Sequence, residues 1–161
     1  MDLIDDVKKT IQEDIKKLQH ELRVILPDMI KKAVELGDLT ENADYQYALQ
    51  RQEFVKIRLG NLSRRLSDIS MINISTLPHD EIGLGSEITL LNLDTDEEKT
   101  FRLVMSEQTD PAKGYISVQS PVGQAFLGKE EGDEVEVKTP QGIKNFEVLK
   151  LKTVHDFKKE S

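Results

Sequence analysis

The apolar residues in the first half of the chain recur with the alternating four-and-three spacing that is typical of a coiled-coil seam. The first run is interrupted only at Lys32, and its members are Ile11, Ile15, Leu18, Leu22, Ile25, Met29 and Leu36. The second run is uninterrupted, and its members are Tyr45, Ala48, Gln52, Val55, Leu59, Leu62, Leu66 and Ile69. The pattern predicts two helices that each present one apolar stripe.

The connection between these helices runs from Gly37 to Asn42 and is short enough to force them to run antiparallel. Arms of about 25–30 residues, at about 1.5 Å of rise per residue, predict a rod of roughly 40 Å. Pro27 lies within the first arm and removes one backbone hydrogen bond, so we expect a bend or a break near it. The first half of the chain is therefore predicted to be a helical hairpin.

The hydrophobic period changes at about residue 75. Between Pro121 and Gly128 we expect a short helix, because proline favours the start of a helix and glycine its end. Alternating or β-branched runs predict strands at residues 87–93, 100–105, 115–119, 134–138 and 145–152. The expected fold class is α+β, with an antiparallel coiled-coil hairpin over residues 1–74, a linker over 75–85 and a small antiparallel-sheet domain with a short helix over 86–161.

The composition excludes several classes of function. The formal net charge is -8, and residues 77–161 hold 10 Lys and Arg against 17 Asp and Glu, which argues against broad binding to duplex DNA and favours a protein partner for that half. There is no Cys, so disulfides and thiolate zinc sites are excluded, and the three His residues form no ligand motif. The charged N-terminal segment has no apolar core, so we expect a soluble, cytoplasmic protein that does not enter a membrane.

Three acidic residues, Asp38, Glu41 and Asp44, gather where the two predicted helices connect. In one interpretation Asp38 is the N-cap of the second helix and Glu41 is its N3 partner in a capping box. In the other, the exposed carboxylates hold Mg²⁺, a hard cation that proteins bind through one or two carboxylates together with phosphates and water. Spacing alone favours the cap, although one carboxylate can serve a metal while another caps the helix.

The run Gly37-Asp-Leu-Thr-Glu-Asn-Ala-Asp-Tyr45, followed by Gln46-Tyr47, resembles the hairpin tip of the GreA/GreB family of bacterial transcript cleavage factors. Three later runs resemble the C-terminal domain of that family and come in the same order; they are Leu91-Asn-Leu-Asp-Thr-Asp-Glu-Glu98, Tyr115-Ile-Ser-Val-Gln-Ser-Pro121 and Leu127-Gly-Lys-Glu-Glu-Gly-Asp-Glu-Val135. The resemblance extends from about residue 27 to the second domain.

The resemblance implies a transcription elongation factor that is not itself an enzyme. The hairpin would enter the secondary channel of bacterial RNA polymerase, while the C-terminal domain, similar to an FK506-binding-protein fold, would dock at the channel rim. The polymerase would then cleave the 3′ end of backtracked RNA, which rescues the arrested complex. Asp38 and Glu41 match the family's acidic pair, which is implied to act in trans by securing a catalytic Mg²⁺ of the polymerase and orienting the attacking water. The free protein, expected to be a monomer, would hold no metal stably.

Several further residues are candidates for contact. Asp44 matches a further acidic position of the family, and Tyr47 could stack on an RNA base. Charged residues beside a coiled-coil seam are usually solvated or paired across it. Basic residues in this position could also attract the extruded RNA. The basic candidates for this role are Lys31, Lys32, Arg51 and Arg58.

Ser120-Pro121 resembles the family's polymerase-docking loop, although a turn before a short helix explains the pair equally well. The chain departs from the family pattern before the tip, where the interval from Pro27 is about one helical turn short. Three alternatives remain: a Gre-like inhibitor that blocks the same channel, a peptidyl-prolyl isomerase, and a plain coiled-coil adaptor. The intact Asp38 and Glu41 pair argues against the inhibitor, and the scarcity of aromatic residues argues against an aromatic-lined proline site.

Overall fold

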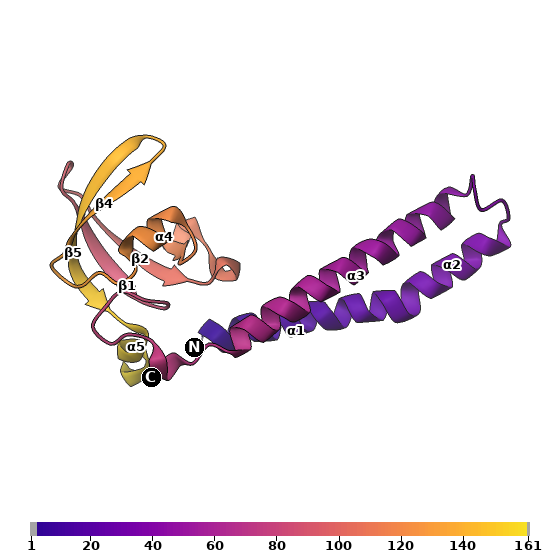
Figure 1. The fold of residues 1–161 in the computed structure, drawn as a ribbon, viewed down its shortest axis with the longest axis horizontal. Helices are drawn as coiled ribbons and strands as arrows, with labels where there is room; N and C mark the ends of the chain where they lie inside the picture. The colour runs from indigo at the N-terminus through magenta and orange to yellow at the C-terminus, as the bar shows by residue number, and fades with distance from the viewer. Residues whose placement is uncertain (1–2, 161) are drawn as a thin grey trace. The chain divides into compact units, whose positions relative to one another are not determined.

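The computed structural model describes the backbone of residues 3–160 and the side chains of residues 3–157. The chain divides into two compact units, Met1–Ile72 and Asn73–Ser161. The first unit is a helical hairpin (Figure 1), as the sequence predicts. Its elements are α1 (Leu3–His20), a π-helical segment (Glu21–Ile25), α2 (Leu26–Glu35) and α3 (Ala43–Ser70).

The predicted seam of the second arm is confirmed. One residue in every seven along α3 is buried against the first arm, and these residues are Ala48, Val55, Leu62 and Ile69. The alternate members of the same stripe are half-buried, and these are Tyr45, Gln52, Leu59 and Leu66. The buried stripe follows one face over the whole length of the helix, and burial of such a stripe supplies most of the stability of a helix in a folded protein.

The predicted seam of the first arm is right as far as Leu22; beyond it Met29 is still half-buried, but the other predicted members are exposed. Ile25 and Leu36 were expected to face the second arm, yet they are 45% and 73% exposed. Leu26 and Ala33 take the buried positions instead, each at 1% exposure. The seam therefore shifts by one residue between Leu22 and Leu26, and this shift explains why the predicted run meets a lysine at position 32.

The cause of the shift lies next to Pro27. The Leu26 N–H donates to the carbonyl of Glu21, five residues earlier, so this turn is wider than an α-helical turn and takes up one extra residue. A proline ring clashes with the carbonyl four residues before it, and the widened turn lies where that clash would occur. The arm changes direction between α1 and α2 (Figure 1) but remains helical through Pro27. The expected bend is confirmed, and a break is wrong.

An ion pair joins the π-helical segment to α3. Arg51 donates from Nε and Nη2 to the two carboxylate oxygens of Glu21, at 2.7 and 2.9 Å. The hydrogen bond from Arg51 holds the pKa of Glu21 below its ordinary value of 4.5, and the same bond raises the pKa of Arg51. The guanidinium also lies 5.0 Å from the ring centroid of Phe54. Two-point pairing of this kind fixes geometry as well as charge.

The second unit is built on one five-stranded sheet with the order β3-β2-β1-β5-β4. The strands are β1 (Glu87–Asn92), β2 (Glu98–Val104), β3 (Tyr115–Ser117), β4 (Glu134–Thr139) and β5 (Gly142–Lys152). All five lie where the sequence predicts strands. The expectation of a purely antiparallel sheet is wrong at one edge, because β3 pairs with β2 in parallel. Two short 3-10 helices, Ser106–Gln108 and Pro111–Lys113, return the chain to the start of β3 within a short connection.

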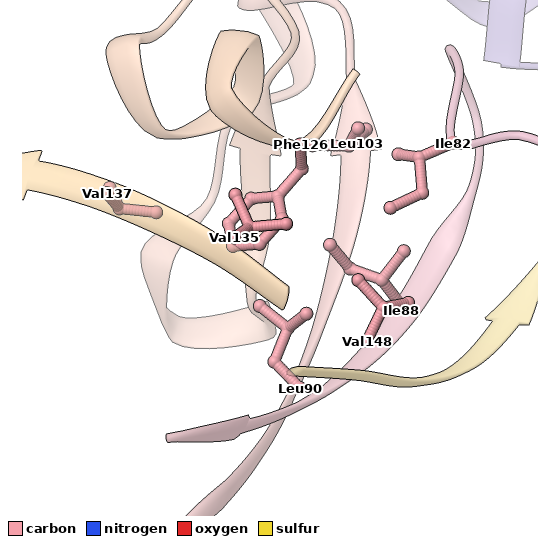
Figure 2. Close-up of a cluster of buried hydrophobic side chains, with 8 residues drawn as sticks. All are labelled: Ile82, Ile88, Leu90, Leu103, Phe126, Val135, Val137 and Val148. Atoms are coloured by element: carbon pink, nitrogen blue, oxygen red, sulfur yellow. The ribbon is translucent and has the colours of Figure 1, made fainter. Parts of the chain in front are cut away.

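The core of the second unit lies between the sheet and α4 (Pro121–Phe126), the helix that the sequence predicts. Phe126 reaches from α4 into this core and is fully buried (Figure 2). Ile82 joins it from before β1, and its backbone pairs with Gly128 and Lys129. The chain therefore enters the second unit's core before the first strand begins. Alternate residues of the strands supply the rest, and these are Ile88, Leu90, Leu103, Val135, Val137 and Val148.

The C-terminal helix α5 (Val154–Glu160) was not expected from the sequence. His155 lies 2.8 Å from the carbonyl of Leu77 through Nε2, and its ring stacks on His79 with centroids 3.7 Å apart. Phe157 lies between the cationic groups of Arg102 and Lys152. Both histidines therefore have packing roles, which tie α5 to the segment before β1.

Gly123 allows α4 to approach the end of β3, and we predict that Gly123→Ala destabilises the second unit by about 2 kcal/mol or more. A Cβ at this position would lie 2.2 Å from the carbonyl oxygen of Ser117, a backbone atom that cannot move away without disturbing β3. Differential scanning calorimetry of the full chain measures the change. Gly60→Ala is the matched control, because its Cβ would meet no atom within 4 Å and should stabilise α3. Equal stability of Gly123→Ala and wild type would contradict the prediction.

The Glu21–Arg51 pair predicts how the hairpin responds to acid. Because the folded state lowers the pKa of Glu21, the pair stabilises the fold fully above pH 4.5 and loses this effect as pH falls through the folded value. Glu21→Gln should therefore lower the melting temperature at pH 6 and reduce its dependence on pH between 6 and 3. Circular dichroism at 222 nm follows the helices.

Arg51→Gln should remove the same pH-dependent contribution to stability. The melting temperature of the double variant should be little lower than that of either single variant. Additive losses would mean that the two residues stabilise the hairpin independently, against the prediction.

Candidate functional site

The candidate site is the tip loop, residues 36–42, which connects α2 to α3. Leu36 N–H donates to the carbonyl of Ala33 at 3.1 Å, and Gly37 N–H donates to that of Val34 at 3.1 Å. These bonds satisfy two of the carbonyl groups that the end of a helix leaves without an intrahelical partner. Gly37 has a φ of +79°, a left-handed conformation that glycine adopts without strain and that commonly ends a helix.

The N-cap of α3 is Asn42. Its side-chain oxygen accepts from the Tyr45 N–H at 3.0 Å, and its backbone is extended, as a capping residue requires. The interpretation of Asp38 and Glu41 as a capping box is therefore wrong. Asp38 instead follows the glycine that ends α2, with a φ of +34° that is incompatible with the extended backbone of an N-cap.

Asp38 and Glu41 are brought together by a turn of the tip loop. Glu41 N–H donates to the Asp38 carbonyl at 3.3 Å, which makes residues 38–41 a four-residue turn. Thr40 donates from its hydroxyl to Asp38 Oδ1 at 2.8 Å, which restricts the orientation of this carboxylate. Both acidic residues are exposed. Since neither carboxylate caps α3, both are available to groups outside the chain.

The donor chemistry of this pair fits Mg²⁺ in part. Carboxylate oxygens are the protein ligands that this cation prefers, and it is commonly bound through one or two of them. Among the side chains that the structure describes, those of residues 3–157, no group of three or more His, Asp or Glu is placed to hold a metal ion. The tip therefore offers two exposed carboxylates, which are fewer oxygens than the full ligand set of a Mg²⁺ ion.

The other acidic and aromatic candidates lie on the first two turns of α3. Asp44 is exposed there, where a negative charge interacts favourably with the helix dipole. Tyr47 is 56% exposed, whereas Tyr45 is half-buried on the seam. Of the two tyrosines, Tyr47 has the ring that an external base could reach.

The predicted RNA-steering residues fall into two groups. Lys31 and Arg58 are exposed. Lys32 pairs with Asp28 at 3.0 Å on the same helix, and Arg51 pairs with Glu21 across the hairpin. Pairing across the seam is the alternative that the sequence left open for Arg51.

Ser120 and Pro121 lie in the second unit at the start of α4. Ser120 is the N-cap of this helix: its hydroxyl accepts from the Gly123 N–H at 3.0 Å and donates to the Ser117 carbonyl at 2.6 Å. Pro121 occupies the first turn of the helix, a position where no N–H is needed. The pair has a local structural role whether or not it also contacts a partner.

Sequence reasoning missed two residues of the tip, Asn42 and Thr40. A signal for Asn42 is present, because asparagine is among the best N-caps and stands directly before the periodic run of α3. The signal was overlooked because Asp38 and Glu41 have capping-box spacing. No sequence signal indicates the bond between Thr40 and Asp38, which depends on the left-handed backbone at Asp38. Elsewhere in the described part of the chain, no helix is long and apolar enough to cross a membrane.

Two family models together match most of the chain. The model described as transcription elongation factor, N-terminal, matches residues 6–70, and the model described as transcription elongation factor, GreA/GreB, C-term, matches residues 77–153. The first therefore matches the hairpin and the second matches the sheet unit.

Curated relatives match over nearly the same length. The transcription elongation factor GreA of Helicobacter hepaticus is 40% identical over 138 residues, which are 86% of this chain and 85% of the relative. The factor of the same name from Sulfurovum is 34% identical over 149 residues, 92% of each chain. The crystal structure of GreA factor homolog 1 of Thermus thermophilus aligns with 90% of this chain and 94% of its own at 22% identity and a TM-score of 0.42. On the family models and the sequence relatives, this chain belongs to the GreA/GreB family of transcription elongation factors.

Proposed function

We propose that this chain inserts its hairpin into the secondary channel of bacterial RNA polymerase and stimulates the polymerase to cleave backtracked RNA. Factors of this family bind RNA polymerase and stimulate its cleavage activity rather than catalysing the reaction themselves. The observation that carries the proposal is the placement of Asp38 and Glu41, whose exposed carboxylates lie at the tip and are not used to cap α3. A purely structural acidic pair would be expected to cap the helix.

Each carboxylate has a role that follows from its charge. Asp38 and Glu41 would supply anionic oxygens to the polymerase's active site, where they could ligate Mg²⁺ and accept a hydrogen bond from the attacking water. When shared between the two proteins, Mg²⁺ would stabilise negative charge on the oxygens that attack and leave during phosphodiester hydrolysis. The chain itself holds its two carboxylates in place and leaves the bond cleavage to the polymerase.

Contacts with the extruded RNA are proposed for the exposed residues around the tip. Lys31 and Arg58 are exposed cations, and Tyr47 offers a ring on which a base could stack. Arg51 and Lys32 would have to exchange their present carboxylate partners for phosphate. We therefore expect Lys31 and Arg58 to contribute more to RNA contact than Arg51 and Lys32.

The sheet unit is proposed to dock at the channel rim through Ser120-Pro121. These residues start α4, a helix whose Phe126 is buried in the core. A docking loop attached to a packed helix keeps its shape when a partner binds, which lowers the entropic cost of association. This part of the proposal rests on the family resemblance of Tyr115–Pro121.

Cleavage of halted, backtracked polymerase complexes with 5′-labelled RNA tests the proposal. Wild type should shorten the transcript. Asp38→Asn and Glu41→Gln should reduce the maximal rate by on the order of 100-fold, the loss expected when one preorganised electrostatic contact at a reacting centre is removed. Asn at position 38 tolerates the left-handed backbone and can still accept from Thr40, so the fold should be retained. Both variants should compete with wild type for polymerase at equal concentrations.

Glu53→Gln removes an exposed carboxylate from α3 away from the tip loop and should cleave like wild type. Wild-type protein that leaves the transcripts at full length would overturn the proposal. Slowed elongation without any cleavage would instead favour an inhibitor that blocks the channel. Cleavage by Asp38→Asn and Glu41→Gln at the wild-type rate would remove the acidic pair from the mechanism.

A further inference from the structure

The tip loop must satisfy the backbone of two helices at once. The final carbonyl groups of α2 and the first N–H groups of α3 lack partners within their own helices. A side chain that only accepts hydrogen bonds can serve the start of α3 but not the end of α2. A residue that joins the two helix ends therefore needs an acceptor and a donor in the same side chain.

Asn42 meets this requirement. Its amide oxygen accepts from the Tyr45 N–H at 3.0 Å, and its amide nitrogen donates to the carbonyls of Ala33 at 2.7 Å and Gly37 at 3.2 Å. These three hydrogen bonds are named here the Asn42 clasp. Asp, Ser and Thr are also good N-caps, but none has an NH₂ group that can donate to two carbonyls. The clasp therefore uses a property that distinguishes asparagine from the other common caps.

The two proposed functional acids lie within the segment that the clasp closes. Asp38 directly follows Gly37, whose carbonyl accepts from Asn42, and Glu41 directly precedes Asn42. Asp38 also has a φ of +34°, in the left-handed region that non-glycine residues rarely adopt. Such a conformation persists when surrounding contacts hold it, and the clasp acts on the residue immediately before it.

The clasp also acts on the turn that joins the acids. The turn is closed by the bond from Glu41 N–H to the Asp38 carbonyl, which at 3.3 Å is longer than the bonds of the clasp to Ala33 and Tyr45. Thr40 then restricts the Asp38 carboxylate through its hydroxyl. Without fixed ends, an exposed turn of this kind has many alternative backbone conformations. The bonds at the ends of the loop therefore help to select one of them, together with the Thr40 bond and the bond from Gln46 Nε2 to the Leu39 carbonyl at 3.4 Å.

We infer that Asn42 is a positioning residue for transcript cleavage. Its amide fixes both ends of the turn that presents Asp38 and Glu41, so it controls where these carboxylates lie without contacting RNA or metal itself. The inference rests on the proposed function, in which the two carboxylates act at the polymerase's active site. It adds that the efficiency of cleavage depends on the donor half of the Asn42 side chain and not only on its capping half.

The test separates the two halves of the amide with Asn42→Ser. Serine keeps an acceptor for the start of α3 but has no NH₂ group, and its single hydroxyl can donate to at most one carbonyl, so at least one of the two donated bonds is lost. The maximal cleavage rate at saturating factor should fall by between about 10-fold and 100-fold, as expected when reacting groups are slightly misplaced. The factor concentration that gives half-maximal cleavage should stay within about 2-fold of wild type, since serine is a good substitute cap. Circular dichroism should give wild-type helix content.

A second readout does not depend on cleavage. Amide hydrogen exchange by NMR should be faster at Glu41 in Asn42→Ser than in wild type, while amides along the seam, such as that of Val55, keep their protection. Asn61→Ser makes the same chemical change at an exposed position in the middle of α3 and should alter neither readout. Asn42→Ala, which loses the cap as well, should have faster exchange at Tyr45 too.

The outcomes distinguish this inference from the proposed function. If wild type cleaves and Asn42→Ser reaches the same maximal rate, the positioning role is overturned and the proposed function stands. A rate that falls only together with helix content or polymerase affinity would also overturn it, because the role would then be structural. If the wild type itself does not cleave, it is no more active than Glu41→Gln. That result contradicts the proposed function, and the positioning role of Asn42 is overturned with it. A reduced maximal rate with unchanged half-saturation and faster Glu41 exchange supports the inference.

Discussion

Two helices that pack along one narrow seam must keep their apolar residues face to face along its whole length. Pro27 makes this difficult in the first arm, because its ring cannot follow a regular α-helical turn. The π-helical segment at Glu21–Ile25 resolves the conflict by taking up one extra residue, after which Leu26 and Ala33 occupy the seam. The register of the whole distal half of the hairpin depends on this single wide turn.

The tip depends on the same register. The shift places Ala33 on the seam, at 1% exposure, and its carbonyl is the acceptor of the shortest bond of the Asn42 clasp. Ala48, on the facing stripe, is also fully buried, and small residues at a contact allow helix axes to approach closely. An unshifted seam would turn Lys32 and Leu36 toward α3 instead. The geometry of the acidic tip is thus linked to a backbone irregularity that ends about three turns before the tip loop.

The sequence predicts those parts of the fold that periodic burial determines. The stripe of α3 and all five strands follow from spacing, because one buried face imposes its period on the residues. The shift after Leu22 could not be predicted, since a π-helical turn leaves no mark on periodicity except an apparent error, here Lys32. The parallel pairing of β3 with β2 could not be predicted for a related reason. Short connections usually join antiparallel strands, and the two 3-10 helices that reverse this rule are visible only in three dimensions.

At the tip, two local rules predict different N-cap residues for α3, and the sequence alone does not decide between them. Asp38 and Glu41 have the spacing of a capping box, while Asn42 has the better position. The backbone decides the outcome, because Gly37 and Asp38 both have a positive φ, and Asp38 therefore lacks the extended conformation of an N-cap. The chain thus ends one helix at Gly37 and begins the other only at Asn42.

This separation of tasks bears on the chemistry. A carboxylate that accepts backbone N–H groups as a cap has part of its charge already satisfied and is a poorer ligand for a cation. By giving the cap to a neutral amide, the chain leaves both acidic side chains exposed, close in sequence and restricted by Thr40 and the turn. Mg²⁺ takes an octahedral set of oxygens, of which protein carboxylates usually supply one or two while phosphates and waters supply the others. A partner that supplies the remaining oxygen ligands would make the two carboxylates effective as Mg²⁺ ligands only within the partner's active site. An accessory factor, unlike an enzyme, depends on its partner in this way. Until the partner binds, the carboxylates of the factor stay exposed to water.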